Sequence, residues 1–121
     1  MHSDVINLRE KLGLFSDHWA PRVIAALNDY QLKLARVKGA FVWHQHADTD
    51  EMFYVVDGAL RIELEDRTVC LNAGELFVVP KGAMHRPVAD EECCILLIEP
   101  RGVVNTGEAG GEYTAPNDRW V

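Results

Sequence analysis

The chain has 121 residues, which fits one domain with a single core, and its 48% apolar and 26% charged residues are typical of a globular protein. Twelve basic against 19 acidic residues give a net charge of −7, which argues against nucleic acid or an anionic membrane as a partner. The N-terminal segment lacks the pattern of a signal peptide, and no apolar run reaches the roughly 18 residues of a membrane span. We therefore expect a small molecule or another protein as the partner.

The N-terminal residues 1–20 are expected to form an arm with one or two helical turns, because their apolar residues are irregularly spaced and interrupted by Gly13. From residue 21 to 100, strand-type runs alternate with turns at intervals of about 8 to 12 residues, which predicts an all-β sandwich or barrel. The predicted strands, about nine in number, are RVIAAL, YQLKLARVK, FVWHQH, EMFYVV, ALRIELE, TVCL, ELFVVP, AMHRPV and ECCILLIEP. Residues 101–121 are rich in glycine and turn formers and are expected to form an irregular strap over the barrel.

Side-chain alternation in the second of these strands places Leu32, Leu34 and Arg36 on one face. If the leucines face the interior, Arg36 does so too, but a bulge near Gly39 would reverse the register. The alternation therefore leaves the orientation of Arg36 open. The candidates for the wall of a ligand pocket are Arg36, Leu34, Val42, Phe53 and Val55.

Four residues form a candidate metal site. His44 and His46 are separated by one residue on an expected strand, so both imidazoles leave the same face. Glu51 follows a turn that lets the next antiparallel strand bring its carboxylate beside them, and His85 follows a Pro-Lys-Gly turn that can direct another strand there. Three imidazoles and one carboxylate suit a divalent first-row metal and leave coordination positions open. The sequence predicts one such ion, Fe, Mn, Ni or Zn, without distinguishing among them.

Other readings apply to other polar residues. An isolated histidine pair at a strand end would be a hydrogen-bonded structural feature. Asp48 and Asp50 lie in the turn before Glu51, where solvated acids are common, so we do not expect them to be ligands. His2 and His18 lack any such setting and are expected to lie at the terminus or in a loop.

The three cysteines, Cys70, Cys93 and Cys94, are odd in number and lack a Cys-x-x-Cys spacing, so neither a disulfide framework nor a thiolate zinc site is indicated. Cys93 and Cys94 lie in an apolar run and are expected to pack as small buried side chains. This pattern predicts a cytoplasmic protein.

The segment from Gly39 to Gly58 resembles the first motif of the cupin family, with His44, His46 and Glu51 at its ligand positions. The segment from Gly74 to His85 is similar to the second motif, in its order of glycine, proline, glycine and histidine. Two positions depart from the family pattern. Gly39 stands one residue nearer to the first histidine than usual, and alanine at position 89 replaces a frequent asparagine. Neither position is that of a ligand.

The resemblance implies a single-domain double-stranded β-helix, or jelly-roll, barrel over residues 21–100 and a homodimer, for which the hairpin 21–39 is the candidate interface. It also implies either a metalloenzyme acting on a small polar metabolite, as a metal-dependent oxygenase or a sugar isomerase, or a non-catalytic module that binds or senses metal and metabolite. A sugar-phosphate isomerase is disfavoured because no second acid-base group is evident. A third reading is a barrel that the metal only stabilises.

Overall fold

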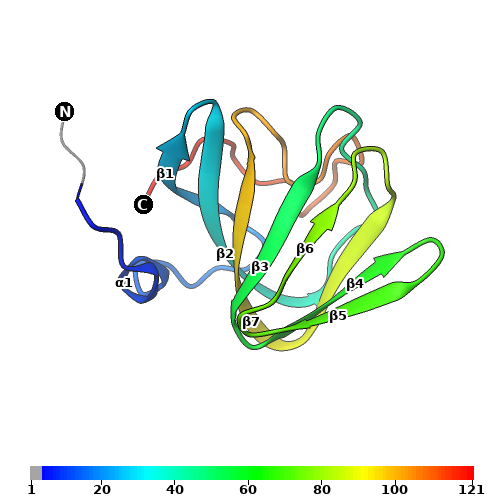
Figure 1. Ribbon diagram of the computed structural model, residues 1–121, viewed down its shortest axis with the longest axis horizontal. Helices are drawn as coiled ribbons and strands as arrows, with labels where there is room; N and C mark the ends of the chain where they lie inside the picture. Colours follow the sequence, from blue (N-terminus) through cyan, green and yellow to red (C-terminus); the bar gives the residue numbers. More distant parts are fainter. Residues whose placement is uncertain (1–3) are drawn as a thin grey trace.

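The computed structural model describes residues 4–121 and shows one short helix and a set of antiparallel strands (Figure 1). Helix α1 lies in the N-terminal arm, and the predicted all-β architecture with a helical N-terminal turn is confirmed. In this part of the chain no helix has the length and apolar character needed to cross a bilayer. The elements are α1 (Leu8–Leu12), β1 (Arg22–Leu27), β2 (Tyr30–Ala40), β3 (Glu51–Asp57), β4 (Ala59–Leu64), β5 (Thr68–Asn72), β6 (Leu76–Val79) and β7 (His85–Pro100).

Seven strands, rather than the expected nine, form within residues 4–121. The last two predicted strands are one strand, because β7 runs without a turn through the acidic residues 90–92. A bulge permits this: Val37 and Gly39 of β2 pair with Cys93 and Ala89 of β7, so β7 has extra residues at this point. The predicted strand at 41–46 is extended chain that forms a single isolated bridge, between His44 and His85.

Strand β7 organises the sheet. It pairs with β2 over most of its length, with β3 through its second half and with β4 through its first half. The strand order is β1-β2-β7-β3-β6, and β4 carries β5 on its other side. Because one long strand contacts both parts of the sheet, the sheet can curve around a common core. The core is apolar and includes Val37, Phe53, Val55, Ile62 and Ile95.

The N-terminal arm covers the other face of β2. Leu12 of α1 and Phe15 pack with Ile24, Leu34 and Cys94 in a second buried cluster, separate from the main core. The helix begins at Asn7, whose side chain accepts a hydrogen bond from the backbone N–H of Glu10 at 3.0 Å. The burial of Leu12 against β2 compensates for the low intrinsic stability of so short a helix.

The C-terminal segment 101–121 returns to β1, and the chain ends beside this strand (Figure 1). The backbone of Val23 in β1 accepts a hydrogen bond from Val121 at 3.1 Å and donates one to Arg119 at 2.7 Å. Asn105 fastens the segment near its start, since its amide donates to the carbonyls of Trp19 and Tyr113 and accepts from the backbone of Ala115. The segment is therefore irregular but firmly attached.

Candidate metal centre

The four predicted ligands are brought together by backbone pairing at one end of the barrel. His44 and His85 exchange two backbone hydrogen bonds, which places the two predicted motifs side by side. His46 is held because its carbonyl accepts from the backbone N–H of Gly82 at 2.9 Å. Glu51 is the first residue of β3 and His85 the first of β7, so both side chains are fixed by regular strands.

The side chains converge on a buried point. One nitrogen or oxygen atom from each of His44, His46, Glu51 and His85 lies within 4.8 Å of the others. Glu51 Oε1 is 3.3 Å from both His46 Nε2 and His85 Nε2. All four residues are buried, with exposures between 0% and 8%. Charged and polar groups at this depth need partners, and a cation between them would provide one.

The hydrogen bonds of two imidazoles orient their free nitrogen toward this point. His44 Nδ1 lies 2.9 Å from the carbonyl oxygen of Val42, and His85 Nδ1 lies 2.9 Å from that of Ala83. A neutral imidazole that donates from Nδ1 carries its lone pair on Nε2. His85 Nε2 and the Glu51 carboxylate oxygen are then both hydrogen-bond acceptors. Because two acceptors repel each other at this distance, a proton or a metal ion must lie between them. Carbonyl partners at Nδ1 are typical of metal-ligating histidines.

The electrostatics favour the protonation states that a metal requires. Burial and, to a smaller extent, the neighbouring His85 lower the pKa of His44 to about 4, so His44 is neutral at physiological pH. Burial alone would raise the pKa of Glu51, but the imidazoles of His46 and His85, each 3.3 Å from Oε1, outweigh burial, and the pKa of Glu51 is lowered. His46 Nε2 has no hydrogen-bond partner within the protein. Neutral imidazoles and an ionised carboxylate fit a divalent transition metal.

Two cavities adjoin the centre. The inner cavity has a volume of about 30 Å³, which admits about two water-sized groups. The outer pocket, of about 390 Å³, includes His46 and residues of the C-terminal segment, among them Arg101. The inner cavity is lined by Trp19, Pro21, Ala35, Val37, Phe41, His44, Glu51, Phe53, Pro87, Ile95, Leu97, Glu99 and Asn105.

Glu99 and Lys33 were not among the residues predicted for the site. Lys33 Nζ lies 2.9 Å from Glu99 Oε1, and their side chains are only 5% and 2% exposed. Burial raises the pKa of Glu99, and the nearby carboxylate of Glu51 raises it further. In the sequence, Glu99 could have been recognised as a candidate site residue because it is a charged residue near the end of the apolar run ECCILLIEP.

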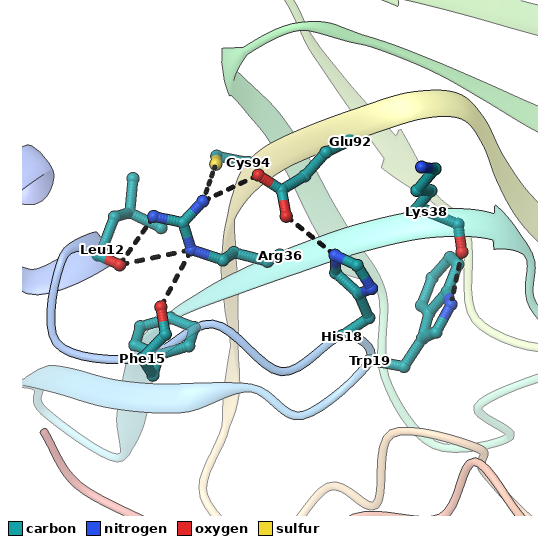
Figure 2. A network of polar contacts seen from close by, with 8 residues as sticks. All are labelled: Leu12, Phe15, His18, Trp19, Arg36, Lys38, Glu92 and Cys94. Atoms are coloured by element: carbon teal, nitrogen blue, oxygen red, sulfur yellow. Dashed lines mark hydrogen bonds and ion pairs between the residues drawn. The ribbon is translucent and has the colours of Figure 1, made fainter.

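The structure corrects part of the predicted pocket wall. Leu34 belongs to the second cluster beneath the N-terminal arm, and Arg36 faces the same side. Figure 2 shows the Arg36 guanidinium between the arm and β7, donating to the carbonyls of Leu12 and Phe15 and to the carboxylate of Glu92. Neither Leu34 nor Arg36 lines the inner cavity. The apolar face of β2 is covered by the arm, and the face with Ala35 and Val37 looks into the barrel.

The other three predicted wall residues lie inside or beside the main core. Phe53 lines the inner cavity, and Val55 is fully buried in the core. Val42 is half-buried against that core and contributes the carbonyl that orients His44. The carboxylate of Asp50 accepts a hydrogen bond at 2.9 Å from the backbone N–H of Lys81, in the turn between β6 and β7. His18 lies far from the centre on the arm side, and His2 falls outside the described residues.

Comparison with known proteins identifies the family. The cupin domain model matches residues 34–99, more than half of the chain. A crystal structure of a cupin-2 domain containing protein from Shewanella frigidimarina NCIMB 400 is 58% identical, covers 80% of this chain and 95% of that chain, and superposes with a TM-score of 0.79. The chain belongs to the cupin family, and the resemblance seen in the two motifs is confirmed.

Two curated proteins are also similar. The uncharacterized protein YdbB of Bacillus subtilis (strain 168) is 41% identical over 64 residues, which cover 52% of this chain and 57% of that protein. An acireductone dioxygenase of Sulfurihydrogenibium sp. (strain YO3AOP1) is 32% identical over 103 residues, which cover 78% of this chain and 55% of that protein. The chain thus spans little more than half the length of either of these relatives.

Proposed function

We propose that this cupin is a divalent-metal-dependent dioxygenase that acts on a small organic molecule, with His44, His46, Glu51 and His85 as the metal ligands. The convergence of four buried ligand atoms within 4.8 Å carries the proposal. A relative that bears the name acireductone dioxygenase supports the reaction class. Among Fe, Mn, Ni and Zn, this class favours a redox-active ion. Such an ion would supply open coordination positions and electrons for dioxygen chemistry.

The protein's own contribution is to hold the ligands and to separate two approaches to the centre. The inner cavity is apolar and of about 30 Å³, which suits a diatomic molecule better than a metabolite. The outer pocket, of about 390 Å³, is in the range of small-molecule sites and offers Arg101 and the backbone of the C-terminal segment. We assign the main part of the organic substrate to this outer pocket. A sugar isomerase fits less well, because the inner walls offer few partners to sugar hydroxyls.

The second candidate is a non-catalytic module that binds metal and senses a metabolite. The small size of the inner cavity favours it, since little room is left beside His44 and Glu51 for a second reactant. In the sensing reading, a metabolite in the outer pocket changes the folding stability of the metal-loaded protein without being converted.

Oxygen uptake separates the two candidates. Iron-loaded wild-type protein is incubated anaerobically with a panel of small enols, diols and phenols, and dioxygen is then added. The dioxygenase predicts uptake with at least one compound and its loss in Glu51→Gln. Asp66→Asn, which changes an exposed acid in the turn between β4 and β5 and outside both cavities, is the control and should retain uptake. Stabilisation by a compound with no uptake by the wild type favours the sensor and contradicts the dioxygenase.

We further propose a homodimer through the outer face of the β2-β7-β3-β6 sheet. Leu32, Ile98, Met52 and Val78 are cross-strand neighbours and form an apolar row there. Val78 and Tyr30 are both 46% exposed. Tyr30 belongs to the hairpin 21–39, which was predicted as the interface. An apolar row of this kind is suited to a second copy of the same face.

Analytical ultracentrifugation tests the proposed dimer. The wild type should sediment as a dimer, and Val78→Lys should dissociate it. Val104→Lys, in the C-terminal segment, is the control and should leave the dimer intact. A monomeric wild type contradicts the proposal.

A cytoplasmic location also remains a proposal. Its support is that Cys70, Cys93 and Cys94 are all free thiols, with Cys93 and Cys94 buried as predicted. Immunoblotting of cell fractions would test it, and recovery in an extracytoplasmic fraction would contradict it.

A further inference from the structure

The ion pair between Lys33 and Glu99 is the most deeply buried pair of opposite charges outside the metal ligands in the described part of the chain. Lys33 Nζ is 2.9 Å from Glu99 Oε1. Burying two charges costs desolvation energy, and an apolar pair of the same size is often equally or more stable. Stability alone therefore gives little reason for this pair. Glu99 of this pair lines the inner cavity together with His44 and Glu51, which suggests a role at the metal centre.

Polar atoms without a partner mark the same region. In residues 4–121 the buried side-chain atoms that lack a hydrogen bond within the protein are Gln31 Oε1, His46 Nε2 and Glu99 Oε2. Gln31 lies directly opposite Glu99 in the β2-β7 register, and His46 is a candidate ligand. A buried acceptor that stays unpaired destabilises the folded protein. A ligand that enters the cavity could remove that destabilisation at Glu99.

The other cavity walls cannot bind the polar group of such a ligand. Phe53, Ile95 and Leu97 are apolar, and Asn105 already uses its amide nitrogen and oxygen for three hydrogen bonds. Apart from the metal ligands, Glu99 Oε2 is thus the polar side-chain atom of the described wall that lacks a hydrogen bond, and the carboxylate of Glu51 is its charged neighbour. A hydroxyl group suits it, because a hydroxyl can both donate and accept a hydrogen bond.

Resting on the proposed metal centre, we propose that Glu99 is a ligand-binding residue whose Oε2 hydrogen-bonds the hydroxyl of a small ligand held at the metal. The ligand class is a molecule with two oxygen atoms on adjacent carbons, one of them a hydroxyl, as in an α-hydroxy acid. Lys33 is a positioning residue, since it fixes Oε1 and leaves Oε2 directed to the ligand. The inner cavity takes the hydroxyl, and the remainder of the ligand extends from the metal toward the outer pocket.

The experiment compares two probes on the full-length protein loaded with Co²⁺, whose visible spectrum reports ligand binding. Glycolate carries the hydroxyl, whereas azide binds metals without one. Glu99→Leu alone would leave Lys33 buried and unpaired, so the variant is Lys33→Met/Glu99→Leu, which replaces the pair by apolar side chains. The control Arg61→Gln/Asp90→Asn removes an exposed ion pair of the same 2.9 Å length.

We expect glycolate to bind about tenfold more weakly to Lys33→Met/Glu99→Leu than to the wild type. Azide should bind no more weakly, and the control should match the wild type with both probes. Equal glycolate affinity in the wild type and the apolar variant overturns the role of Glu99, as does a parallel loss of both probes or a variant that cannot fold. Failure of the wild type to bind Co²⁺ overturns the metal centre itself, and is recognised before any probe is added.

Discussion

The backbones of His44 and His85 are joined by two hydrogen bonds, of 3.0 Å from His44 N to His85 O and 2.9 Å from His85 N to His44 O. This bridge joins residues 41 positions apart in the sequence (85 minus 44) and is the point where the two cupin motifs meet. The rings follow the backbone, with their centroids 4.2 Å apart. The convergence of the candidate ligands is therefore a consequence of main-chain pairing.

Because the backbone makes the bridge, the imidazole of His85 can be removed with the barrel intact. We expect His85→Gln to lower metal affinity by about 100-fold or more, since one of four ligands is lost and the loss of a residue that only hydrogen-bonds a ligand already costs about 10- to 100-fold. Competition with a chromophoric chelator measures this. His18→Gln is the matched control, because His18 is a half-exposed histidine paired with Glu92 on the arm side. Equal metal affinity in the two variants would exclude His85 as a ligand.

At Gly107 the C-terminal segment lies against the backbone of the segment that carries His44 and His46. Its φ is +59°, and an added Cβ would overlap the carbonyl oxygen of Gln45, the residue between His44 and His46. We expect Gly107→Ala to lower the free energy of unfolding by about 2 kcal/mol more than the control. The control is Gly110→Ala, whose φ of +65° imposes similar backbone strain but whose surroundings are open. Urea unfolding measures both, and equal losses would show that the segment can move away at no cost.

Arg36 should stabilise the N-terminal arm and contribute nothing to the metal centre. Its guanidinium donates to the carbonyls of Leu12 and Phe15 at 2.8 to 3.2 Å (Figure 2). We expect Arg36→Met to lower the free energy of unfolding by about 1 to 2 kcal/mol, because these carbonyls lose their donor. Metal content should remain that of the wild type. A loss of bound metal with no loss of stability would contradict this prediction and would support the earlier assignment of Arg36 to the pocket wall.

The docking of the arm should also depend on pH through Glu92. Its carboxylate accepts from His18 at 2.7 Å and from Arg36 at 2.9 Å, and these contacts lower the pKa of Glu92 below its ordinary value of 4.5. A carboxyl whose folded pKa is lowered stabilises the folded state above the unfolded value and loses that contribution as pH falls through the folded value. We expect hydrogen exchange in residues 8–16, corrected for intrinsic rate, to increase as pH falls below about 4.5. Glu92→Gln should exchange faster at pH 7 and show a smaller change with pH, and an unchanged pH profile would contradict this role.

The convergence of His44, His46, Glu51 and His85 could be predicted from the sequence, whereas which face of β2 points into the barrel could not. Histidine spacing and the turn chemistry before His85 are local properties, and they determine which side chains share a face. Alternation in β2 separates Leu34 and Arg36 from Lys33 and Ala35 but does not say which pair is inside. The leucine face proved to be covered by the arm, and the interior face carries a lysine. A buried lysine is unexpected from polarity alone, because it depends on Glu99, 66 residues further along the chain (99 minus 33).

The sequence predicted two strands where the structure has the single strand β7, and the reason is again a tertiary contact. Residues 89–91 separate the two strands predicted from the sequence, but they belong to a continuous strand, whose residues 90–92 form a bulge opposite β2. Pairing with two different strands on either side of this point stabilises the bend. Only the tertiary partners distinguish such a bend from a loop.

The central claim is that one divalent metal is bound by all four side chains at once. Anomalous diffraction from crystals of metal-loaded protein, recorded on both sides of the metal's absorption edge, tests it most directly. The account predicts one strong peak per chain at about 2.0 to 2.2 Å from a nitrogen of His44, His46 and His85 and from an oxygen of Glu51. A peak elsewhere, or a peak bonded to only some of these four residues, would contradict it, as would the absence of any peak.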